Sequence, residues 1–450
     1  MECLLNRVFV SSCSDYEPAK ICSLLPDSIF MQIKPGDRVV IKPNWVFESH
    51  KIKRDDWEYV ITHPAVISAV IKKVLDRLSN CGRISIIDGP MTEASFAKLL
   101  SRYPVSDWRQ WAEQNGIQFE IVDLRDHEWV MKNGVIVDRI SLPGDPRGKV
   151  LVDLLGDTSE FWGHNKTSRG YYGADYDIAE TNRAHDGYHN LYSVSRTVIE
   201  SDVFVNIPKL KTHRKAGITC CLKNLVGINT YKNYLPHHSE GGPHDGGDQF
   251  PVDTVSTRFE GPLIGFVKQN LLMNPMFARI LSPFKTLALK VFGNSSSIVR
   301  NGSWYGNDTI WRMILDLNKV LFYSGVDGSM GDDTPLRRKR YIGVVDAIYA
   351  GEGDGPLAPD CVKMGYLFCG TNPVSIDYAC ACFMGFDPSH IRSIAQAFHI
   401  QKYPLCEFTD ENISVVLNDI EFNIMGLPED AIFKLKPQFG WIGSIEKNTY

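Results

Sequence analysis

The sequence predicts an α/β fold, namely a doubly wound, mostly parallel sheet with long inserted loops and a small helical insertion. Strands rich in β-branched residues alternate with helical periodicity through the first 125 residues, and the alternation returns after residue 194. Such alternation is typical of parallel sheets covered by helices on both faces. The chain has 450 residues, of which 44% are hydrophobic and 22% charged, and this average composition excludes disordered, collagen-like and coiled-coil chains.

The first half of the fold is expected from five segments in order. A β-branched strand over 38–42 ends at a Pro-Asn pair, and a helix over 64–79 begins with proline in its first turn. A strand over 83–87, a helix over 93–114 and a strand over 117–122 continue the pattern. These segments form one doubly wound unit.

The second half is less regular. Residues 126–192 lose periodicity and are predicted to be a long functional loop, as is the segment 229–251. The remaining predicted elements are a helix over 194–200, strands over 202–207, 341–349 and 365–368, and helices beginning near 217, 309 and 372. A turn-like loop is predicted over 351–356.

Residues 1–250 and 304–450 are expected to form one α/β domain, or two α/β lobes with a cleft between them, and 251–303 a helical insertion. Within the part over 260–300, the stretch 265–292 is apolar, contains two prolines and carries only four charges, all basic. It is predicted to be a helical subdomain or protein contact, with peripheral contact to a membrane surface as the alternative. An oligomer is compatible with either.

Charge is distributed unevenly. The formal net charge of −5 gives no general attraction to nucleic acid, so we expect no nucleic-acid partner. The window 209–232, however, contains six lysines and arginines and no acidic residue. It follows a predicted parallel strand, and open α/β sheets bind ligands beyond the carboxyl ends of their strands. The window therefore predicts a site for a small phosphorylated or carboxylated molecule.

The candidate site residues come from this window and from other strand ends. His213, Lys211 and Lys223 are predicted to be catalytic, because imidazole and lysine can exchange protons near neutral pH. Candidates for substrate binding are Lys42, Asn44, Asp88, Lys209, Asn224, Glu352, Asp354 and Asn372.

Histidines are concentrated in the two irregular segments. Seven of the twelve fall between 164 and 244, accompanied by several aspartates. Three interpretations stay open: a divalent metal, a hydrogen-bonded lid, and metal-free acid/base catalysis. The candidate metal ligands are His185, His189, His237 and Asp248.

Cysteine spacing limits the cofactors. The eleven cysteines are scattered and include no C-x-x-C pair, so an iron–sulfur cluster motif is not found and reduced thiols in the cytoplasm are expected. No stretch approaches 18 uninterrupted apolar residues. The glycine-rich loop at 351–356 carries two acids, which would repel a phosphate, so it is no nucleotide-cofactor fingerprint.

Five motifs resemble the family called domain of unknown function 362. They are IKPNWV at 41–46, THP at 62–64, VNIPKLKTHRKAGITCCLKNLVGI at 205–228, AGEGDGPLAP at 350–359 and GTNPVSIDYACACFMGFDP at 370–388. Many members carry a ferredoxin-type cysteine cluster that this chain lacks. The long form, with YYGADYDIAETNRAH and NYLPHHSEGGPHDGGDQFP, is similar to members found near polysaccharide-assembly genes. The resemblance implies a sugar-linked substrate. The cytoplasmic location is expected from the cysteines, with peripheral contact to the inner membrane as an alternative.

Three functions follow as hypotheses. The first, which we favour, is an enzyme that binds a small anion in a Lys/His-lined cleft and performs acid/base chemistry such as epimerisation or elimination. The second is a non-catalytic binding or scaffolding component of a membrane-associated polysaccharide-assembly system. The third is a redox protein that has lost its iron–sulfur module.

Overall fold

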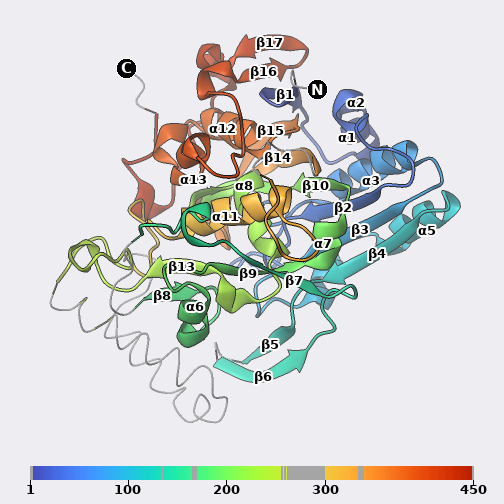
Figure 1. Ribbon diagram of the computed structural model, residues 1–450. Coiled ribbons are helices and arrows are strands. Elements are labelled where there is room, and N and C mark those ends of the chain that lie inside the picture. The colour runs from blue at the N-terminus through green and yellow to red at the C-terminus, as the bar shows by residue number, and fades with distance from the viewer. Residues whose placement is uncertain are drawn as a thin grey trace.

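A mixed sheet of eleven strands runs through the centre of the computed structural model, which describes residues 4–132, 135–164, 170–254, 257, 260, 299–332 and 339–447 (Figure 1). The main strand order is β17-β16-β1-β15-β14-β10-β2-β3-β4, and β11 and β12 extend from β14. The bounds are β1 Arg7–Ser12, β2 Arg38–Pro43, β3 Arg83–Asp88, β4 Gln118–Asp123, β10 Val203–Ile207, β11 Lys209–His213, β12 Gly217–Thr219, β14 Arg340–Asp354, β15 Ala358–Gly370, β16 Ser414–Leu417 and β17 Ile420–Asn423.

Parallel pairing dominates the half of the sheet formed by β14, β10, β2, β3 and β4. Antiparallel pairs occur where β15 joins β14 and β1, at the β16–β17 hairpin, and between β11 and β12. Strands from both ends of the sequence thus share one sheet. The α/β fold predicted from the sequence is confirmed.

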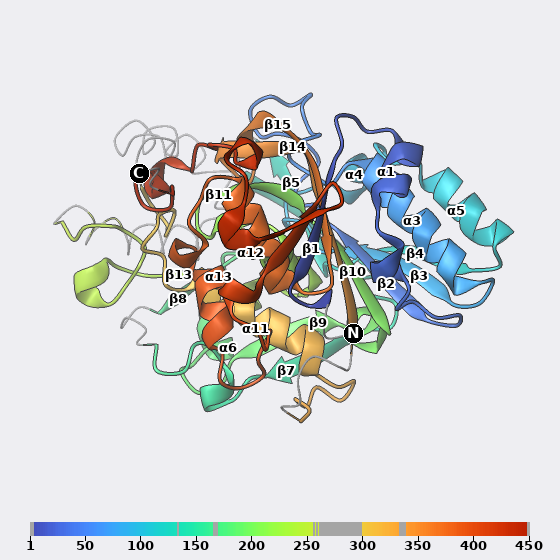
Figure 2. The same ribbon diagram turned by 90° about the horizontal axis from the view of Figure 1, so that it is seen from above.

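Helices cover both faces of the sheet (Figures 1 and 2). The helices α1, α3 and α5 lie on one side, and α11, α12 and α13 lie on the other (Figure 2). The bounds are α1 Pro18–Leu24, α2 Asp27–Phe30, α3 Pro64–Leu78, α4 Phe96–Leu100, α5 Val105–Gln114, α6 Ile178–Ala184, α7 Arg196–Glu200, α8 Cys221–Asn224, α11 Ile310–Tyr323, α12 Pro373–Phe383 and α13 Arg392–Ala395.

Alternating side chains divide the core into two layers. On β2, Val39 and Ile41 join the layer beneath α3, while Val40 joins the layer beneath α11. On β10, Val205 and Phe204 are separated in the same way. Because successive strand residues point to opposite faces, an uninterrupted apolar strand fills both layers.

Several predicted elements differ from the observed ones. The helix predicted over 93–114 is two helices, because Pro104 cannot continue α4 and instead precedes α5. The helix predicted from Gly217 begins only at Cys221, because Gly217 has a left-handed φ of 80° in the turn between β11 and β12. The loop predicted over 351–356 is mostly the end of the long β14–β15 hairpin.

Residues 126–192 are also more ordered than predicted. They contribute to three small two-stranded sheets, β5–β6, β7–β9 and β8–β13. The bounds are β5 His127–Lys132, β6 Val135–Ser141, β7 Lys149–Asp153, β8 Tyr171–Gly173, β9 Leu191–Ser195 and β13 Pro236–Ser239. Two of these sheets join strands far apart in the sequence, so short-range periodicity could not reveal them.

The predicted insertion at 251–303 lies mostly outside the described residues, as does the apolar segment 260–300 that was predicted to dock on protein or lipid. Within the described ranges, no helix has the length and apolar composition needed to cross a bilayer.

Candidate functional site

The strand order creates a crevice beside β2. The chain runs outward from β2 to β3 and β4, and then returns to β10 on the opposite side of β2. In doubly wound sheets ligands bind outside the carboxyl ends of the strands where the order reverses. Here those ends carry Lys42 and Asn44 after β2, Asp88 after β3, and Lys211 beyond β10.

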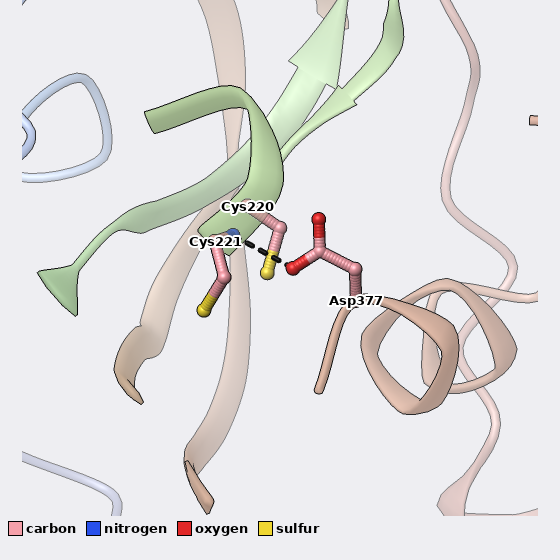
Figure 3. A group of neighbouring side chains, drawn as sticks. All are labelled: Cys220, Cys221 and Asp377. Carbon is pink, nitrogen blue, oxygen red and sulfur yellow. Dashed lines mark hydrogen bonds between the residues drawn. The ribbon is translucent and has the colours of Figure 1, made fainter. Parts of the chain in front are cut away.

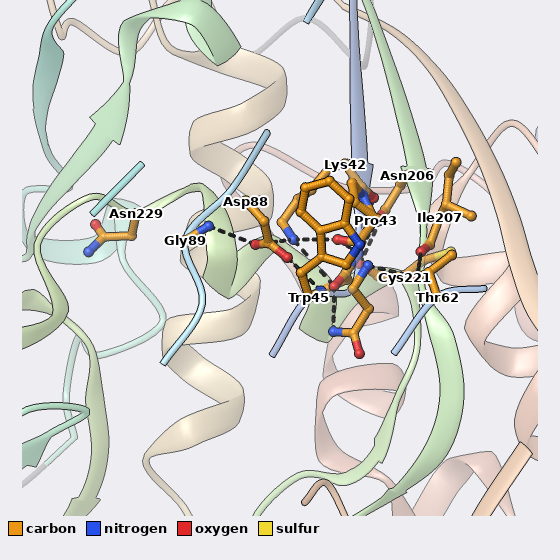
Figure 4. Close-up of polar contacts among 12 residues, drawn as sticks. Lys42, Pro43, Trp45, Thr62, Asp88, Gly89, Asn206, Ile207, Cys221 and Asn229 are labelled. Carbon is orange, nitrogen blue, oxygen red and sulfur yellow. Dashed lines mark hydrogen bonds and ion pairs between the residues drawn. The ribbon is translucent and has the colours of Figure 1, made fainter. Parts of the chain in front are cut away.

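A buried ion pair joins the ends of β2 and β3. Lys42 Nζ lies 2.8 Å from Asp88 Oδ1, and their side chains are 1% and 4% exposed. The backbone N–H groups of Trp45 and Gly89 donate to the two oxygens of Asp88 at 2.7 and 2.8 Å (Figure 4). Asp88 thereby ties together both strand ends. Burial lowers the pKa of Lys42, and the charge of Asp88 opposes that effect.

An amide pair connects this ion pair to Lys211. Asn44 Nδ2 donates to Asn224 Oδ1 at 2.8 Å, and Asn44 Oδ1 accepts from Lys211 Nζ at 2.9 Å. Lys211 also donates to the backbone oxygen of Val60. The network holds residues from β2, β11 and α8 in fixed positions.

A cavity of about 390 Å³ opens onto this network. Its volume lies within the range of about 300–1,000 Å³ that is usual for small-molecule sites. Side chains from β2, β3, β11, α8 and β13 line it, together with the loop before α6. Its lining contains the basic residues Lys42, Lys51, Lys211, Arg214, Lys215, Lys223 and Lys232, the acids Asp88, Glu93 and Asp175, and His213, His237 and His238.

Basic side chains therefore outnumber carboxylates in the cavity. Burial lowers the pKa values of three of its lysines. Burial, followed by the charges of neighbouring lysines, lowers the pKa of Lys223 to about 7. Burial lowers the pKa of Lys232 to about 8. The pKa of Lys211 is lowered well below its usual value by burial and then by Lys209 and Lys223. An anion in the cavity would relieve this repulsion and favour the protonated lysines.

Two histidines in the cavity have opposite tautomers. His213 Nδ1 accepts from the backbone N–H groups of Lys215 and Ala216, both at 3.1 Å, so the proton of its neutral ring is on Nε2. His237 Nδ1 lies 2.8 Å from the carbonyl oxygen of Leu235 and must donate to it, which leaves a lone pair on Nε2. One ring can donate a proton to a ligand and the other can accept one.

Burial keeps both rings neutral. The pKa of His213 is well below its usual value because of burial and then the charge of Lys223. Burial, followed by the charges of Lys215 and Lys223, has the same effect on the pKa of His237.

Seven of the eleven catalytic and binding candidates line the cavity, namely Lys42, Asn44, Asp88, Lys211, His213, Lys223 and Asn224. The other four lie elsewhere. Lys209 Nζ is 2.6 Å from Asp346 Oδ2 in a fully buried pair. Glu352 accepts from the backbone N–H of Lys436, Asp354 pairs with Arg214, and Asn372 caps α12. None of these four lines the cavity, so we leave them out of the site.

The four candidate metal ligands also lie apart. Both ring nitrogens of His185 contact protein oxygens, of Asn190 and Tyr234, and the exposed His189 pairs with Asp153. Asp248 accepts from Ser239, Asp308 and Thr309. Of the four, His237 alone lines the cavity.

Cys220, Cys221 and Asp377 form the one group of three potential ligands within 4.8 Å that the described residues contain (Figure 3). The oxygens of Asp377 accept from the backbone N–H groups of Cys221 and Leu222 at 2.7 and 3.0 Å, at the start of α8. Burial raises the pKa of both thiols. We assign this group to capping α8 and to core packing.

A larger concavity of about 710 Å³ lies between α11 and α13. It is shallow, and its central carboxylate, Asp308, is paired with Arg312 at 3.0 Å and Arg392 at 2.6 Å. Because its charges neutralise each other, this surface provides less for a ligand than the smaller cavity.

Lys339 shows what a purely structural buried lysine looks like in this chain. Its Nζ donates to the carbonyl oxygens of Val198, Ile199 and Ser201 and to Ser201 Oγ, at 2.7–3.1 Å. Burial lowers the pKa of Lys339 to about 7.

We expect the unfolding free energy of the wild type to rise with pH relative to that of Lys339→Met. Between pH 7 and 10 the unfolded chain keeps the Lys339 proton and the native state has lost it, so the native state is favoured as pH rises. The maximum slope is about 1.4 kcal/mol per pH unit. Urea unfolding of both proteins at pH 7, 8 and 9 measures the difference, and parallel curves would contradict the lowered pKa.

Lys232, His237 and Lys215 line the cavity although they were not predicted as catalytic or binding residues. Lys232 Nζ donates to the carbonyl oxygen of Gly89 at 2.6 Å and so reaches the end of β3. Its place in the basic window 209–232 could have identified it. His237 could not be placed, because β8 and β13 pair across the 62 residues between them, with Gly173 opposite Pro236 and a shift in register before Tyr172 and His238.

Comparison with known proteins found no match among curated sequences. Among solved structures, the lactate racemase apoprotein from Thermoanaerobacterium thermosaccharolyticum aligns at 12% identity with a TM-score of 0.33. The alignment covers 84% of this chain and 57% of that one, so this chain spans little more than half of that structure. A family model described as "Domain of unknown function (DUF362)" matches residues 39–146 and 171–382, which include the strand ends and lysines of the site. The chain belongs to the DUF362 family.

Proposed function

We propose that the protein is an enzyme that binds a small phosphorylated or carboxylated molecule in the 390 Å³ cavity and transfers a proton at one of its carbon atoms. The observation that carries this proposal is the pair of neutral histidines with opposite tautomers in a cationic cavity. Epimerisation and elimination both need a base and an acid at the same substrate, so they fit the pair best.

The lysines of the cavity support the proposed binding of an anion. Seven basic side chains and three carboxylates line the cavity, and one of those carboxylates, Asp88, is already paired with Lys42. The remaining positive charge is partly desolvated, which strengthens its attraction to a phosphate or carboxylate. The volume fits a sugar acid or sugar phosphate.

The histidines support proton transfer. His237 Nε2 carries the lone pair and would accept a proton from a C–H bond next to a carbonyl or carboxylate group. His213 Nε2 carries a proton and would donate it to the carbanion or to the leaving group. Both roles are set by backbone hydrogen bonds to Nδ1, so neither ring must turn to begin the reaction.

Titration calorimetry with inorganic phosphate tests the anion site. We expect proton uptake on binding at pH 8, because a bound anion raises the pKa values of Lys223 and Lys232 from about 7 and about 8. Lys211→Met should weaken binding at least about tenfold, equal to 1.4 kcal/mol, whereas Lys98→Met, at an exposed position, should not. Equal affinities in all three proteins would contradict the site.

Hydrogen exchange tests the chemistry. A panel of uronates and sugar phosphates is incubated in D₂O with the protein, and loss of C–H signals is followed by NMR. His213→Ala and His237→Ala should each slow exchange by about 10²–10⁴ while phosphate affinity changes less than threefold. Exchange that is insensitive to both variants, or its absence for every probe that binds, would contradict proton transfer.

A further inference from the structure

Lys223 differs from Lys42, Lys211 and Lys232 of the cavity in having no fixed partner. Lys42 is paired with Asp88, Lys211 with Asn44 and Val60, and Lys232 with Gly89. Within the described part of the chain, Lys223 Nζ makes no hydrogen bond or ion pair, although the side chain lines the cavity. Its amine is therefore available to a ligand.

The comparison with Lys339 excludes a simple packing role for Lys223. Lys339 is buried and Lys223 is partly buried, and both have a pKa of about 7. Lys339, however, gives its protons to four oxygen atoms, an arrangement that holds the side chain in one place. Lys223 is held by α8 only through its backbone, and its side chain ends among other cations.

Those cations make Lys223 a nucleophile near neutral pH. The groups that act on its charge are Lys232, Lys42 and Asp88, and Lys223 in turn acts on Lys211, His213 and His237. Desolvation beside other cations is the arrangement that activates lysine for attack on carbonyl groups. A substantial fraction of the amine is neutral at pH 7.

We propose that Lys223 forms a Schiff base with the carbonyl carbon of a small oxo acid whose acidic group is held by the neighbouring lysines. This inference rests on the proposed anion site and names its substrate class. The neutral amine adds to the carbonyl carbon to give a carbinolamine. Loss of one water then leaves a C=N bond between Lys223 and the substrate, with no net oxidation or reduction.

The Schiff base would allow the two histidines to transfer a proton at the substrate carbon. Once protonated, the imine withdraws electrons and acidifies the adjacent C–H bond. His237 Nε2 takes that proton, the C–H electron pair becomes a C=C bond, and the imine nitrogen receives the displaced pair. His213 Nε2 donates its proton to carbon, and the proton held by His237 passes through water to His213, which restores both rings. Water then hydrolyses the imine to restore Lys223. The cycle consumes nothing beyond the substrate.

Reductive trapping with pyruvate tests the proposal. The wild-type protein is incubated with pyruvate and sodium cyanoborohydride, which reduces the imine to a stable secondary amine, and the modified lysine is located by peptide mass spectrometry. We expect the adduct at Lys223, with a rate that rises with pH through an inflection near 7. Lys339 in the same digest should remain unmodified. Lys98 reports the background reaction of an exposed amine.

Lys223→Arg keeps a cation but cannot form an imine, so it should lower the adduct at this position at least 100-fold. Lys98→Arg should leave the wild-type yield unchanged. Trapping that is equal at Lys98 and Lys223, or phosphate and pyruvate binding without any adduct at Lys223, overturns the Schiff base and leaves the anion site intact. Failure of both anions to bind overturns the proposed function itself. Because the wild-type adduct is mapped directly, the test does not depend on how the variant folds.

Discussion

Replacing Asp88 by alanine should lower the free energy of unfolding by about 3–5 kcal/mol, because it leaves a buried lysine without its counter-charge. The carboxylate also accepts two backbone N–H groups, of Trp45 and Gly89, and these would lose their partner in the same substitution. Urea unfolding at pH 7 measures the loss. Phosphate affinity should fall as well, since both strand ends that form the cavity are held by this one side chain.

The matched control is Asp360→Ala. Asp360 pairs with Lys53 at 3.2 Å, but the two side chains are 74% and 54% exposed. Exposed pairs contribute about 0–1 kcal/mol, so this variant should remain close to the wild type. If the two substitutions had similar effects, the Lys42–Asp88 pair would not be the structural centre of the site.

Gly227→Ala should disrupt the same pair without removing a charge. A Cβ atom at this position would lie 2.0 Å from Asp88 Oδ1 and 2.6 Å from Lys42 Nζ. The two side-chain ends cannot move away cheaply because each is buried and bonded to the other. We expect a loss of stability of about 1–3 kcal/mol, as for overpacked cores, and phosphate binding weakened at least tenfold in calorimetry.

Gly426→Ala is the control for the added methyl group, since nothing lies within 4 Å of its Cβ position. It should change stability by less than about 0.5 kcal/mol. A second comparison introduces Gly227→Ala into the Asp88→Ala variant, in which the main clash is absent. There the substitution should lower the free energy of unfolding by less than it does in the wild type. Additive losses would show that Gly227 acts independently of the ion pair.

Much of the site was predictable because the carboxyl ends of parallel strands meet at one edge. The β-branched runs that became β2, β3 and β10 located that edge, and the basic window located its ligand chemistry. Lys42, Asp88, Lys211 and Lys223 came together as a result.

Lys209 shows why the rest was not predictable. It lies two residues before Lys211 on the same strand, and no sequence pattern separates the roles of the two lysines. Its partner Asp346 stands opposite it only because of the register between β11 and β14. The tautomers of His213 and His237 depend likewise on backbone atoms within two or three residues of each ring, placed by turns that periodicity does not describe.

The place of β1 in the sheet has a consequence for synthesis of the chain. This strand pairs with β15 and β16 and with no strand nearer to it in the sequence among those described. Val8, for example, stands opposite Gly370 and Val415. A loop as long as the chain between β1 and β15 closes slowly, and a strand exposes apolar surface as long as it is unpaired. The strands β2, β3 and β4 can pair as soon as they are synthesised, whereas β1 finds its neighbours only after β15 and β16 have been made.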